Sequence, residues 1–461
     1  MRSLGLVLGL SLSLIACRTR EHPAPRLPSG VDAPRGAGAP SASVPTSPSN
    51  ATSAARPSGT PAPTSAAPPA LPPEPPADSV ARDAAGARRF AVELTRELAS
   101  HSKQNLFVSP ASIRTALGMA WLGAAGTTRD EMERVLHYED RGATSAVLRW
   151  VLARWRARGA GASPNAPRDV LRVVNHAWGR KGLPFLGSYR DALATTYEAP
   201  LEELDFAMAP AASRAAINDW VNGATEGKIS DLVPDGAITS DAALVLTSAV
   251  YFKASWRNPF PVEGTQDGAF ASVPTPVPFM SRTGDLSYAK VPGAAIVELP
   301  YAGGDQAMLV VLPDAKDGLG AFVRALGPTA LDGFVAALRP ARVHVTLPRF
   351  SAGSATSLAA PLAALGMKRA FDAKQADFSG IDGRRDVFVS AAVHQAVVTV
   401  DEHGTEAAGA TALTMSLTSL RVGPIVEFRV DHPFLFVIRD VALGHALFVG
   451  LVTNPGSATQ G

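Results

Sequence analysis

Residues 400–424 read VDEHGTEAAGATALTMSLTSLRVGP, a run of mostly small side chains with no proline before Pro424. A strand places alternate residues on the same face. From 405 to 417 one such face carries no charge and consists of Thr405, Ala407, Gly409, Thr411, Leu413, Met415 and Leu417. Alanine and glycine are frequent in the run, although strands favour β-branched and aromatic residues. The segment is therefore predicted to fit a sheet without being committed to one.

The composition predicts a large globular protein and gives no electrostatic case for a nucleic-acid partner. The chain has 461 residues, of which 46% are hydrophobic and 18% are charged, and its net charge is +2. Hydrophobic content of this kind can form a large core at this length. Proteins that bind nucleic acid carry a marked excess of positive charge, so we expect no nucleic acid among the partners.

The first sixteen residues, MRSLGLVLGLSLSLIA, are predicted to be a signal peptide. Their apolar run is too short to cross the ~30 Å hydrocarbon core of a bilayer comfortably. Cys17 follows, and LIAC resembles the bacterial lipobox, in which the signal is cut before a cysteine that is then lipidated. The alternative is an ordinary signal peptide with an incidental cysteine. Because Cys17 is the only cysteine, no intramolecular disulfide can form.

The rest of the chain divides into a tether, a domain and a tail. Residues 17–78 are rich in Pro, Ala, Ser, Thr and Gly, which offer too little apolar bulk to offset the entropy of ordering, so we expect a disordered tether there. Near Ser79 the pattern becomes periodic, and apolar residues follow roughly helical spacing at Phe90, Val92, Leu94 and Leu98. We therefore expect a mixed α and β domain at 79–456 and a flexible tail at 457–461.

A series of motifs in the domain resembles the serpins, the serine protease inhibitors. In the order of that family, the motifs are NLFVSPASIRTALGMAWLGAAGTTRDEM at 105–132, VVNHAWGRKG at 173–182, INDWVNGATEGKISDLV at 217–233, AVYFKASWRNPF at 249–260, VELPYAGGDQAMLVVLP at 297–313, VTLPRF at 345–350, LGMKRAFD at 365–372, ADFSGI at 376–381 and DHPFLFVIRD at 431–440. The resemblance covers essentially the whole domain. It implies an α+β serpin fold with three β-sheets, about nine helices and an exposed reactive-centre loop.

The resemblance also gives the opening stretch a role. In serpins the reactive loop is exposed in a metastable native protein and, after a protease cuts it, inserts as a new strand in the largest sheet. From Thr405 to Leu417 such a strand would be on the order of 45 Å long. The residues that match the inhibitory form of the hinge are Glu402, Gly404, Thr405, Glu406, Ala407, Ala408, Gly409, Ala410 and Thr411. The resemblance implies a protease inhibitor that catalyses nothing itself and needs no cofactor or metal.

The family's usual spacing places the reactive bond between Thr418 and Ser419. A small residue at that position favours elastase-like or subtilisin-like targets. The register is open by a few residues, so Leu417 or Leu420 would imply chymotrypsin-like targets and Arg421 trypsin-like ones. Cysteine proteases are a further target class that the resemblance allows.

Other residues match structural positions of the family. Ser109, Ser112 and His394 fall where serpins place a polar cluster beneath the main sheet, called the shutter. Ser248 stands where the family usually has asparagine, so we expect a water to complete that cluster. Trp256 matches the tryptophan at the insertion point, called the breach, and Arg349 with Glu402 matches a salt bridge that would contribute ~0 to 1 kcal/mol if partly exposed.

The alternatives to an inhibitor are a serpin-like binding or chaperone module and a hydrolase. The sequence lacks G-x-S-x-G, H-E-x-x-H and P-loop motifs, which argues against the hydrolase. Arg149, Arg154, Arg156 and Arg158 lie in the region where some serpins bind polyanionic activators, although an exposed basic helix looks the same. We expect a monomeric serpin that is lipid-anchored to the bacterial cell envelope, at the outer membrane or cell surface, or extracellular if released.

Overall fold

The computed structural model describes residues 71–160, 170–405 and 424–456. These residues belong to one compact unit, which spans Ala67–Gly461. Cys17, the signal peptide, almost all of the tether, the reactive-loop residues from 406 to 421 and the tail at 457–461 lie outside the described residues.

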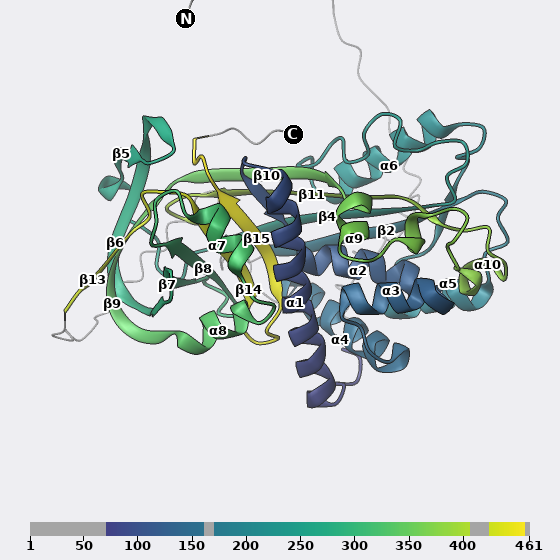
Figure 1. Ribbon diagram of the computed structural model, residues 1–461, viewed down its shortest axis with the longest axis horizontal. Helices are drawn as coiled ribbons and strands as arrows, with labels where there is room; N and C mark the ends of the chain where they lie inside the picture. Colours follow the sequence, from purple (N-terminus) through teal and green to yellow (C-terminus); the bar gives the residue numbers. More distant parts are fainter. Residues whose placement is uncertain (1–70, 161–169, 406–423, 457–461) are drawn as a thin grey trace, which may run out of the picture. The chain divides into compact units, whose positions relative to one another are not determined.

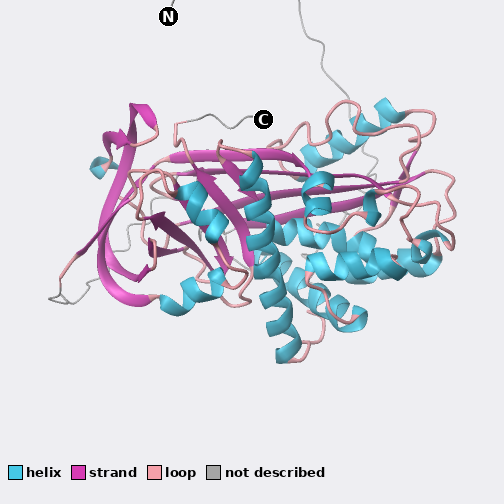
Figure 2. Cartoon of the chain, in the orientation of Figure 1, coloured by secondary structure: helices cyan, strands magenta, loops and turns pink. Residues whose placement is uncertain are grey.

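Helices and strands are partly segregated in this unit (Figures 1 and 2). Helices α2 to α5 gather on one side of the long strands, and α1 crosses the middle of the view. The helices of the described residues are α1 (Ala77–His101), α2 (Pro110–Trp121), α3 (Gly126–Leu136), α4 (Arg141–Ala160), α5 (Gly187–Tyr197), α6 (Pro210–Ala224), α7 (Leu319–Ala325), α8 (Ala330–Ala337), α9 (Ala359–Ala364) and α10 (Ser379–Asp382), with short 3-10 turns η1 (Val262–Gly264) and η2 (Arg369–Phe371).

The strands form two hydrogen-bonded sheets in the described part of the chain. One has the order β1-β15-β14-β8-β7-β6-β9-β13, with β5 paired to β6, and the other has the order β10-β11-β12-β4-β2-β3. The bounds are β1 (Leu106–Val108), β2 (Val170–Arg180), β3 (Glu202–Leu204), β4 (Leu244–Ser255), β5 (Gln266–Phe270), β6 (Val273–Val291), β7 (Ala294–Pro300), β8 (Gln306–Pro313), β9 (Arg339–Pro348), β10 (Phe350–Ser357), β11 (Val389–Val400), β12 (Gly404–Thr405), β13 (Val426–Arg429), β14 (Phe434–Asp440) and β15 (Ala446–Val452).

The expected mixed α+β architecture is confirmed, with one difference in how the sheets are joined. Three sheets were expected, but β6 is long enough to pair with β5 at its start, with β9 along its middle and with β7 at its end. Two of the three sheets are therefore continuous through β6 and form the nine-stranded sheet.

Helix α1 buries one face, as its apolar spacing predicts. Phe90 and Leu94 are fully buried, and Val92 and Leu98 are nearly so. Residues four apart lie on the same side of a helix, so Phe90, Leu94 and Leu98 form one stripe. This stripe joins the main hydrophobic core.

The six-stranded sheet is covered on both faces, which explains why its central strands are so apolar. On one face, α2 contacts β4 and β2, and Phe448 of β15 packs against Phe252 of β4; these residues belong to the main core. On the other face, Ile217 and Val221 of α6 pack with Trp178, Val245 and Val393 in a second cluster. A strand buried on both faces reads as a continuous apolar run rather than an alternating one, as β4 does.

No helix among the residues that the structure describes is both long and apolar enough to span a membrane.

Candidate functional site

The shutter residues meet in the core beneath the middle of the six-stranded sheet. Ser109 caps the start of α2, where its Oγ accepts a hydrogen bond from the Ser112 amide at 3.2 Å. His394 on β11 and Ser248 on β4 are direct partners in the strand register. All four residues are buried, so the sequence positions predicted to meet do lie together.

Hydrogen bonds fix the state of the buried histidine. The Ser109 amide donates to His394 Nε2 at 3.0 Å, so this nitrogen carries no hydrogen and Nδ1 carries one. Nδ1 donates to the Ser248 carbonyl oxygen at 3.0 Å. Burial lowers the pKa of His394 to about 4 from 6.5, although the bond to Ser248 acts in the opposite direction. The ring is therefore neutral at pH 7.

The water expected beside Ser248 is not needed, because Ser248 reaches its partners directly. Its Oγ lies 2.9 Å from Ser112 Oγ and 3.1 Å from His394 Nδ1. The cluster still contains a side-chain amide, that of Asn175. Ser112 Oγ donates to Asn175 Oδ1 at 2.7 Å, and Asn175 Nδ2 donates to the Ser112 carbonyl oxygen at 2.8 Å. Asn175 lies on β2, directly across from Ser248.

Asn175 was not among the residues singled out in the sequence. The signal was present, because Asn175 is a polar residue in the otherwise apolar run VVNHAW. Buried polar side chains in strands are usually hydrogen-bonded, so such a residue is a candidate member of a polar cluster.

At the breach, Glu402 is held by three groups. Arg349 donates to Glu402 Oε1 through Nη2 at 2.6 Å and Nε at 2.7 Å, and Thr265 Oγ1 also donates to it. Burial raises the pKa of Glu402, but these hydrogen bonds outweigh burial and hold the pKa below its usual 4.5. The Glu402 side chain is 2% exposed. The weak contribution expected for a partly exposed pair therefore does not apply to its carboxylate.

Trp256 and Tyr301 form the floor under the start of the loop. Their rings stack with centroids 4.6 Å apart, and Trp256 Nε1 donates to the Asp401 carbonyl oxygen at 2.9 Å. Tyr301 Oη and Thr405 Oγ1 lie 2.7 Å apart and share a hydrogen bond. Thr405 is fully buried. Tyr301 was quoted in a sequence motif without a role, and this contact gives it one.

The chain turns back on itself after β11 and enters the sheet. Asp401 Oδ1 accepts from the amides of His403 and Gly404, at 2.8 Å and 3.2 Å. Gly404 and Thr405 then form β12, which pairs antiparallel with β11 on one side and with β4 on the other. The first residues of the predicted hinge are therefore already a strand.

Gly404 is required by this arrangement. A Cβ atom at this position would lie 2.1 Å from the Ala254 carbonyl oxygen of β4, far inside van der Waals contact. Only glycine lets the two backbones approach so closely.

Beyond β12 the sheet is closed. From Val389 to Ala396, β11 pairs directly with β4 from Leu244 to Val250, and the two strands are parallel. Parallel pairing is slightly less stable per residue than antiparallel pairing. The gap between these strands is thus open at the end that holds β12 and shut along the rest of their length.

The remaining hinge residues Glu406, Ala407, Ala408, Gly409, Ala410 and Thr411, and the reactive-bond candidates Leu417, Thr418, Ser419, Leu420 and Arg421, lie outside the described residues. Their assignment stays a prediction.

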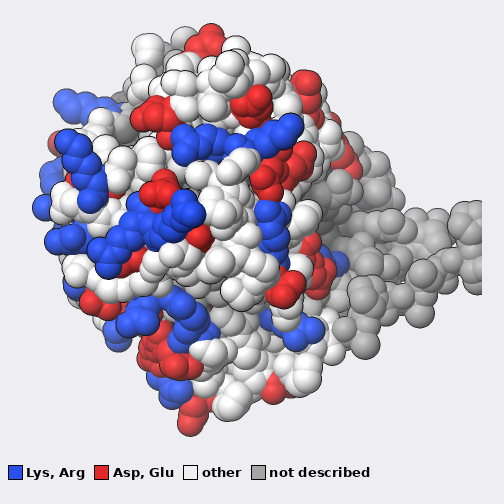
Figure 3. Space-filling model, turned by 90° about the vertical axis from the view of Figure 1, so that its right-hand side faces the viewer, with Lys and Arg blue, Asp and Glu red and all other residues white. Residues whose placement is uncertain are grey.

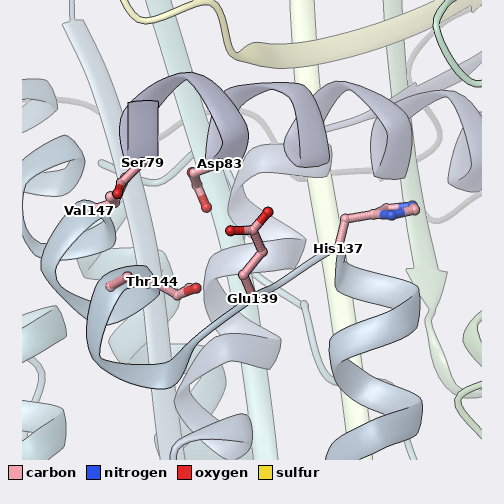
Figure 4. A pocket seen from close by; sticks show the side chains of 7 residues that line it. Ser79, Asp83, His137, Glu139, Thr144 and Val147 are labelled. Atoms are coloured by element: carbon pink, nitrogen blue, oxygen red, sulfur yellow. The ribbon is translucent and has the colours of Figure 1, made fainter. Parts of the chain in front are cut away.

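A second polar cluster surrounds the start of α1 and serves packing. Asp83 contacts Arg114 at 2.8 Å and His445 at 3.2 Å. Burial raises the pKa of Asp83, but Arg114 and His445 outweigh burial and hold it well below its usual range. Figure 4 shows Asp83 and Glu139 on facing segments, with His137 pointing away from both. Across the described residues, no three His, Cys, Asp or Glu side chains are grouped as metal ligands would be.

Two of the four arginines singled out on α4 are paired with carboxylates. Arg156 Nη2 lies 2.5 Å from Glu198 Oε1, and Arg158 pairs with Asp440 and with Asp305. The Arg154 guanidinium lies 4.9 Å from the Trp150 ring centroid. Figure 3 shows a face of the molecule on which positive and negative side chains are interspersed. The structure thus gives little support to a polyanion site on this helix.

Comparisons with known proteins agree with this geometry. Residues 85–455 match the family model described as Serpin (serine protease inhibitor). The chain is 35% identical over 384 residues to leukocyte elastase inhibitor of Sus scrofa, covering 81% of this chain and 99% of that one, and 35% identical over 376 residues to antithrombin-III of Mus musculus, covering 80% of each. The structure of uncleaved ovalbumin superposes with a TM-score of 0.70 at 26% identity, covering 81% of this chain and 100% of that one.

In the six-stranded sheet, β12 lies between β11 and β4 at the breach, and β11 pairs directly with β4 at the shutter. This arrangement defines a serpin fold. The chain belongs to the serpin family, whose members are generally protease inhibitors and not catalytic enzymes.

Proposed function

We propose that this serpin inhibits serine-type endopeptidases by trapping them covalently during loop cleavage. The observation that carries the proposal is β12, in which Gly404 and Thr405 already lie as a strand between β11 and β4. Residues after Thr405 can extend that strand only if β11 and β4 separate. Cleavage frees the far end of the loop and permits this extension.

In the proposed reaction, the serine hydroxyl of the protease adds to the carbonyl carbon of Thr418. The peptide bond to Ser419 then breaks, the nitrogen of Ser419 takes up a proton, and Thr418 remains as an ester on the protease. Water would normally hydrolyse this ester. Insertion of the loop carries the ester and the protease away from the breach and distorts the protease before hydrolysis occurs.

The register of β12 says where each inserted residue would arrive. Thr405 pairs with Val400 and with Ala254. If the same antiparallel register continues, Thr411 arrives between His394 and Ser248, on the face where Thr405 lies. A hydroxyl would then take the place of the direct contact between these shutter residues. The insertion also replaces a parallel pairing by two antiparallel ones, which favours the inserted state.

Elastase-like or subtilisin-like proteases are the proposed targets, with cysteine proteases as a further class. Thr418 is small, which suits a shallow specificity pocket, and the relative from Sus scrofa carries the name leukocyte elastase inhibitor. The monomer suffices for this function, because β11, β12 and β4 belong to one chain.

We further propose that Cys17 is lipidated and that the protein is held at the bacterial cell envelope. The support is the sequence LIAC after an apolar run, followed by the proline-rich tether. Intact mass of the protein from the producing cell tests this, with Cys17→Ser as the variant. A membrane-bound, acyl-modified wild type and an unmodified variant are expected, whereas an unmodified wild type would overturn the proposal.

The test of inhibition uses residues 17–461 with elastase, subtilisin, chymotrypsin and trypsin. We expect a complex that survives denaturing electrophoresis and a released fragment that begins at Ser419. A protease whose active-site serine is replaced by alanine is the control, because it cannot form the ester. Cleavage without any stable complex would instead favour a non-inhibitory binding or chaperone module.

A further inference from the structure

A cover of helix and loop lies over the two strands that separate during loop insertion. Its apolar side chains come from α6 and from the segment that follows α6, and they belong to the second hydrophobic cluster. That cluster also contains Val245 of β4 and Val393 of β11, so the cover packs on both sides of the gap between these strands. Figure 1 shows α6 on the opposite side of the strands from α2.

The cover cannot stay in place when a strand enters the gap. Neighbouring strands lie about 4.8 Å apart, so one added strand moves β4 away from β11 by about that distance. A close-packed layer cannot keep its contacts with both strands over such a change. The contacts that hold α6 to the sheet therefore limit how readily the gap opens.

His176 of β2 lies beneath the cover and contacts α6 through Trp220. The centroid of the imidazole ring lies 4.6 Å from that of the Trp220 ring and 4.2 Å from that of the Trp178 ring. The two indoles meet edge to face, with centroids 5.3 Å apart. His176 is only 4% exposed, so its ring has almost no contact with water while α6 is in place.

The ring also lies level with the closed part of the gap. His176 pairs with Thr247 of β4, and Thr247 pairs with Val393 of β11 across the gap. Directly paired residues share one face of a sheet, and Val393 belongs to the cluster on the α6 face. This row of three residues therefore lies on the face opposite the shutter, and separation of β4 from β11 breaks the row beside His176.

The buried imidazole lacks the hydrogen bonds that would stabilise it in either charge state. Within the described residues, His176 Nε2 has no hydrogen-bond partner. Glu202 of β3 is the only described carboxylate in ion-pair range, and its Oε2 lies 3.7 Å from Nε2, too far for a hydrogen bond. Burial lowers the pKa of His176 to about 4. The other charged or titratable residues of the surrounding elements are Arg214 and Asp219 of α6, Arg172 and Arg180 of β2, Glu203 of β3, and Tyr251 and Lys253 of β4.

We propose that His176 makes the cover over the gap sensitive to acid, so that protonation of its ring releases Trp220 and α6 from the sheet. A charged imidazole is stable in water and costly beneath α6. Acid therefore favours the state in which the cover has lifted and the ring meets water. Acid then also speeds loop insertion, a consequence that rests on the proposed function.

Linkage gives the size and the sign of the effect. The covered ring binds fewer protons than a ring in water with the ordinary pKa of 6.5, so lifting takes up a proton. Lifting becomes more favourable as the pH falls through 6.5, and the gain levels off below about pH 4. Between pH 7 and pH 5 the equilibrium for lifting shifts by about twentyfold when the lifted state restores the ordinary pKa.

The test compares amide hydrogen exchange of α6 in the full wild-type chain and in His176→Phe, at pH 7 and at pH 5. Phenylalanine keeps a ring between the two indoles but cannot take up a proton. The amides of α6 have the same intrinsic exchange rate in both proteins at a given pH, so the ratio of the measured rates reports the lifting of α6. We expect the ratio of wild-type to variant rates to rise about twentyfold from pH 7 to pH 5.

His176→Gln keeps a polar side chain and should lose the acid response in the same way. His344→Gln is the matched control, because His344 lies on β9 outside the cover, and it should respond to acid as the wild type does. An acid response that persists in both His176 variants would overturn the proposal. Equal exchange of α6 and β8 in the wild type at pH 5 would also overturn it, because the whole domain would then be unfolding. The test uses no protease, so its result is separate from that for the proposed trapping.

Discussion

Thr405 is the residue at which the loop enters the sheet, and its environment tolerates no charge. It is fully buried, and its hydroxyl bonds to Tyr301. Replacing it by Thr405→Arg would place an ion at a fully buried position beside the Tyr301 hydroxyl, which costs several kcal/mol. We expect the variant to be cleaved by the target protease and to release it, so that many more inhibitor molecules are consumed for each protease trapped.

Titration of the variant against a fixed amount of protease measures this number directly. Thr405→Ser is the control, because it keeps the hydroxyl that bonds to Tyr301, and it should behave nearly as the wild type. A Thr405→Arg protein that traps protease as efficiently as the wild type would refute the inward placement of this residue in the inserted loop.

His394 makes the shutter sensitive to acid. Its pKa is about 4 in the folded protein and 6.5 as the ordinary value, so between these pH values the unfolded chain binds more protons. Stability is therefore full above pH 6.5 and falls as the pH drops towards 4. The loss from this residue between pH 7 and pH 5 is about 2 kcal/mol. Protonated Nε2 can no longer accept from Ser109.

Chemical unfolding at several pH values tests this prediction. His176 also has its pKa lowered to about 4 by burial, so both histidines contribute to the same window. In His394→Gln the loss of stability between pH 7 and pH 5 should be smaller by about 2 kcal/mol. An unchanged dependence would show that His394 does not titrate as its burial requires.

At the scale of elements, β12 depends on Gly404. The variant Gly404→Ala introduces a Cβ atom 2.1 Å from the Ala254 carbonyl oxygen. We expect β12 to leave the gap between β11 and β4. Amide exchange over residues 401–405 should then rise about tenfold or more, because the hydrogen bonds of β12 are lost.

Gly327→Ala is the control, since a Cβ atom there meets nothing within 4 Å. It should leave exchange at β12 as in the wild type. If Gly404→Ala also left exchange there unchanged, the close approach of β12 to β4 would not exist in solution.

The sequence predicted the positions of the elements better than the contacts between them. The motifs led to the family because they are distributed along the whole domain, and α1 showed its buried stripe as a simple period. The partnership of Asn175 with Ser112 could not be read in this way, since it joins a strand to a helix far away in the sequence. The burial of Thr405 in β12 was also not predicted. A period of two shows which residues share a face, but it does not show whether the strand is already formed in the intact protein.

At the scale of the whole molecule, the six-stranded sheet can gain further hydrogen-bonded strand pairing. β11 and β4 are parallel neighbours along the closed part of the gap, and a cleaved loop would give each of them an antiparallel partner. The two cores lie on opposite faces of this sheet, so insertion adds pairing at the centre of the molecule. The cut protein should therefore be more stable than the intact one.

The most direct measurement is the thermal unfolding temperature of the protein before and after cleavage within residues 406–423. Calorimetry or circular dichroism can monitor this unfolding. The account predicts that the cut protein unfolds at a much higher temperature than the intact one. It also predicts that cleavage raises the unfolding temperature of the Thr405→Arg variant much less than that of the wild type. Equal unfolding temperatures for the intact and the cut wild type would contradict insertion between β11 and β4, and with it the proposed trapping mechanism.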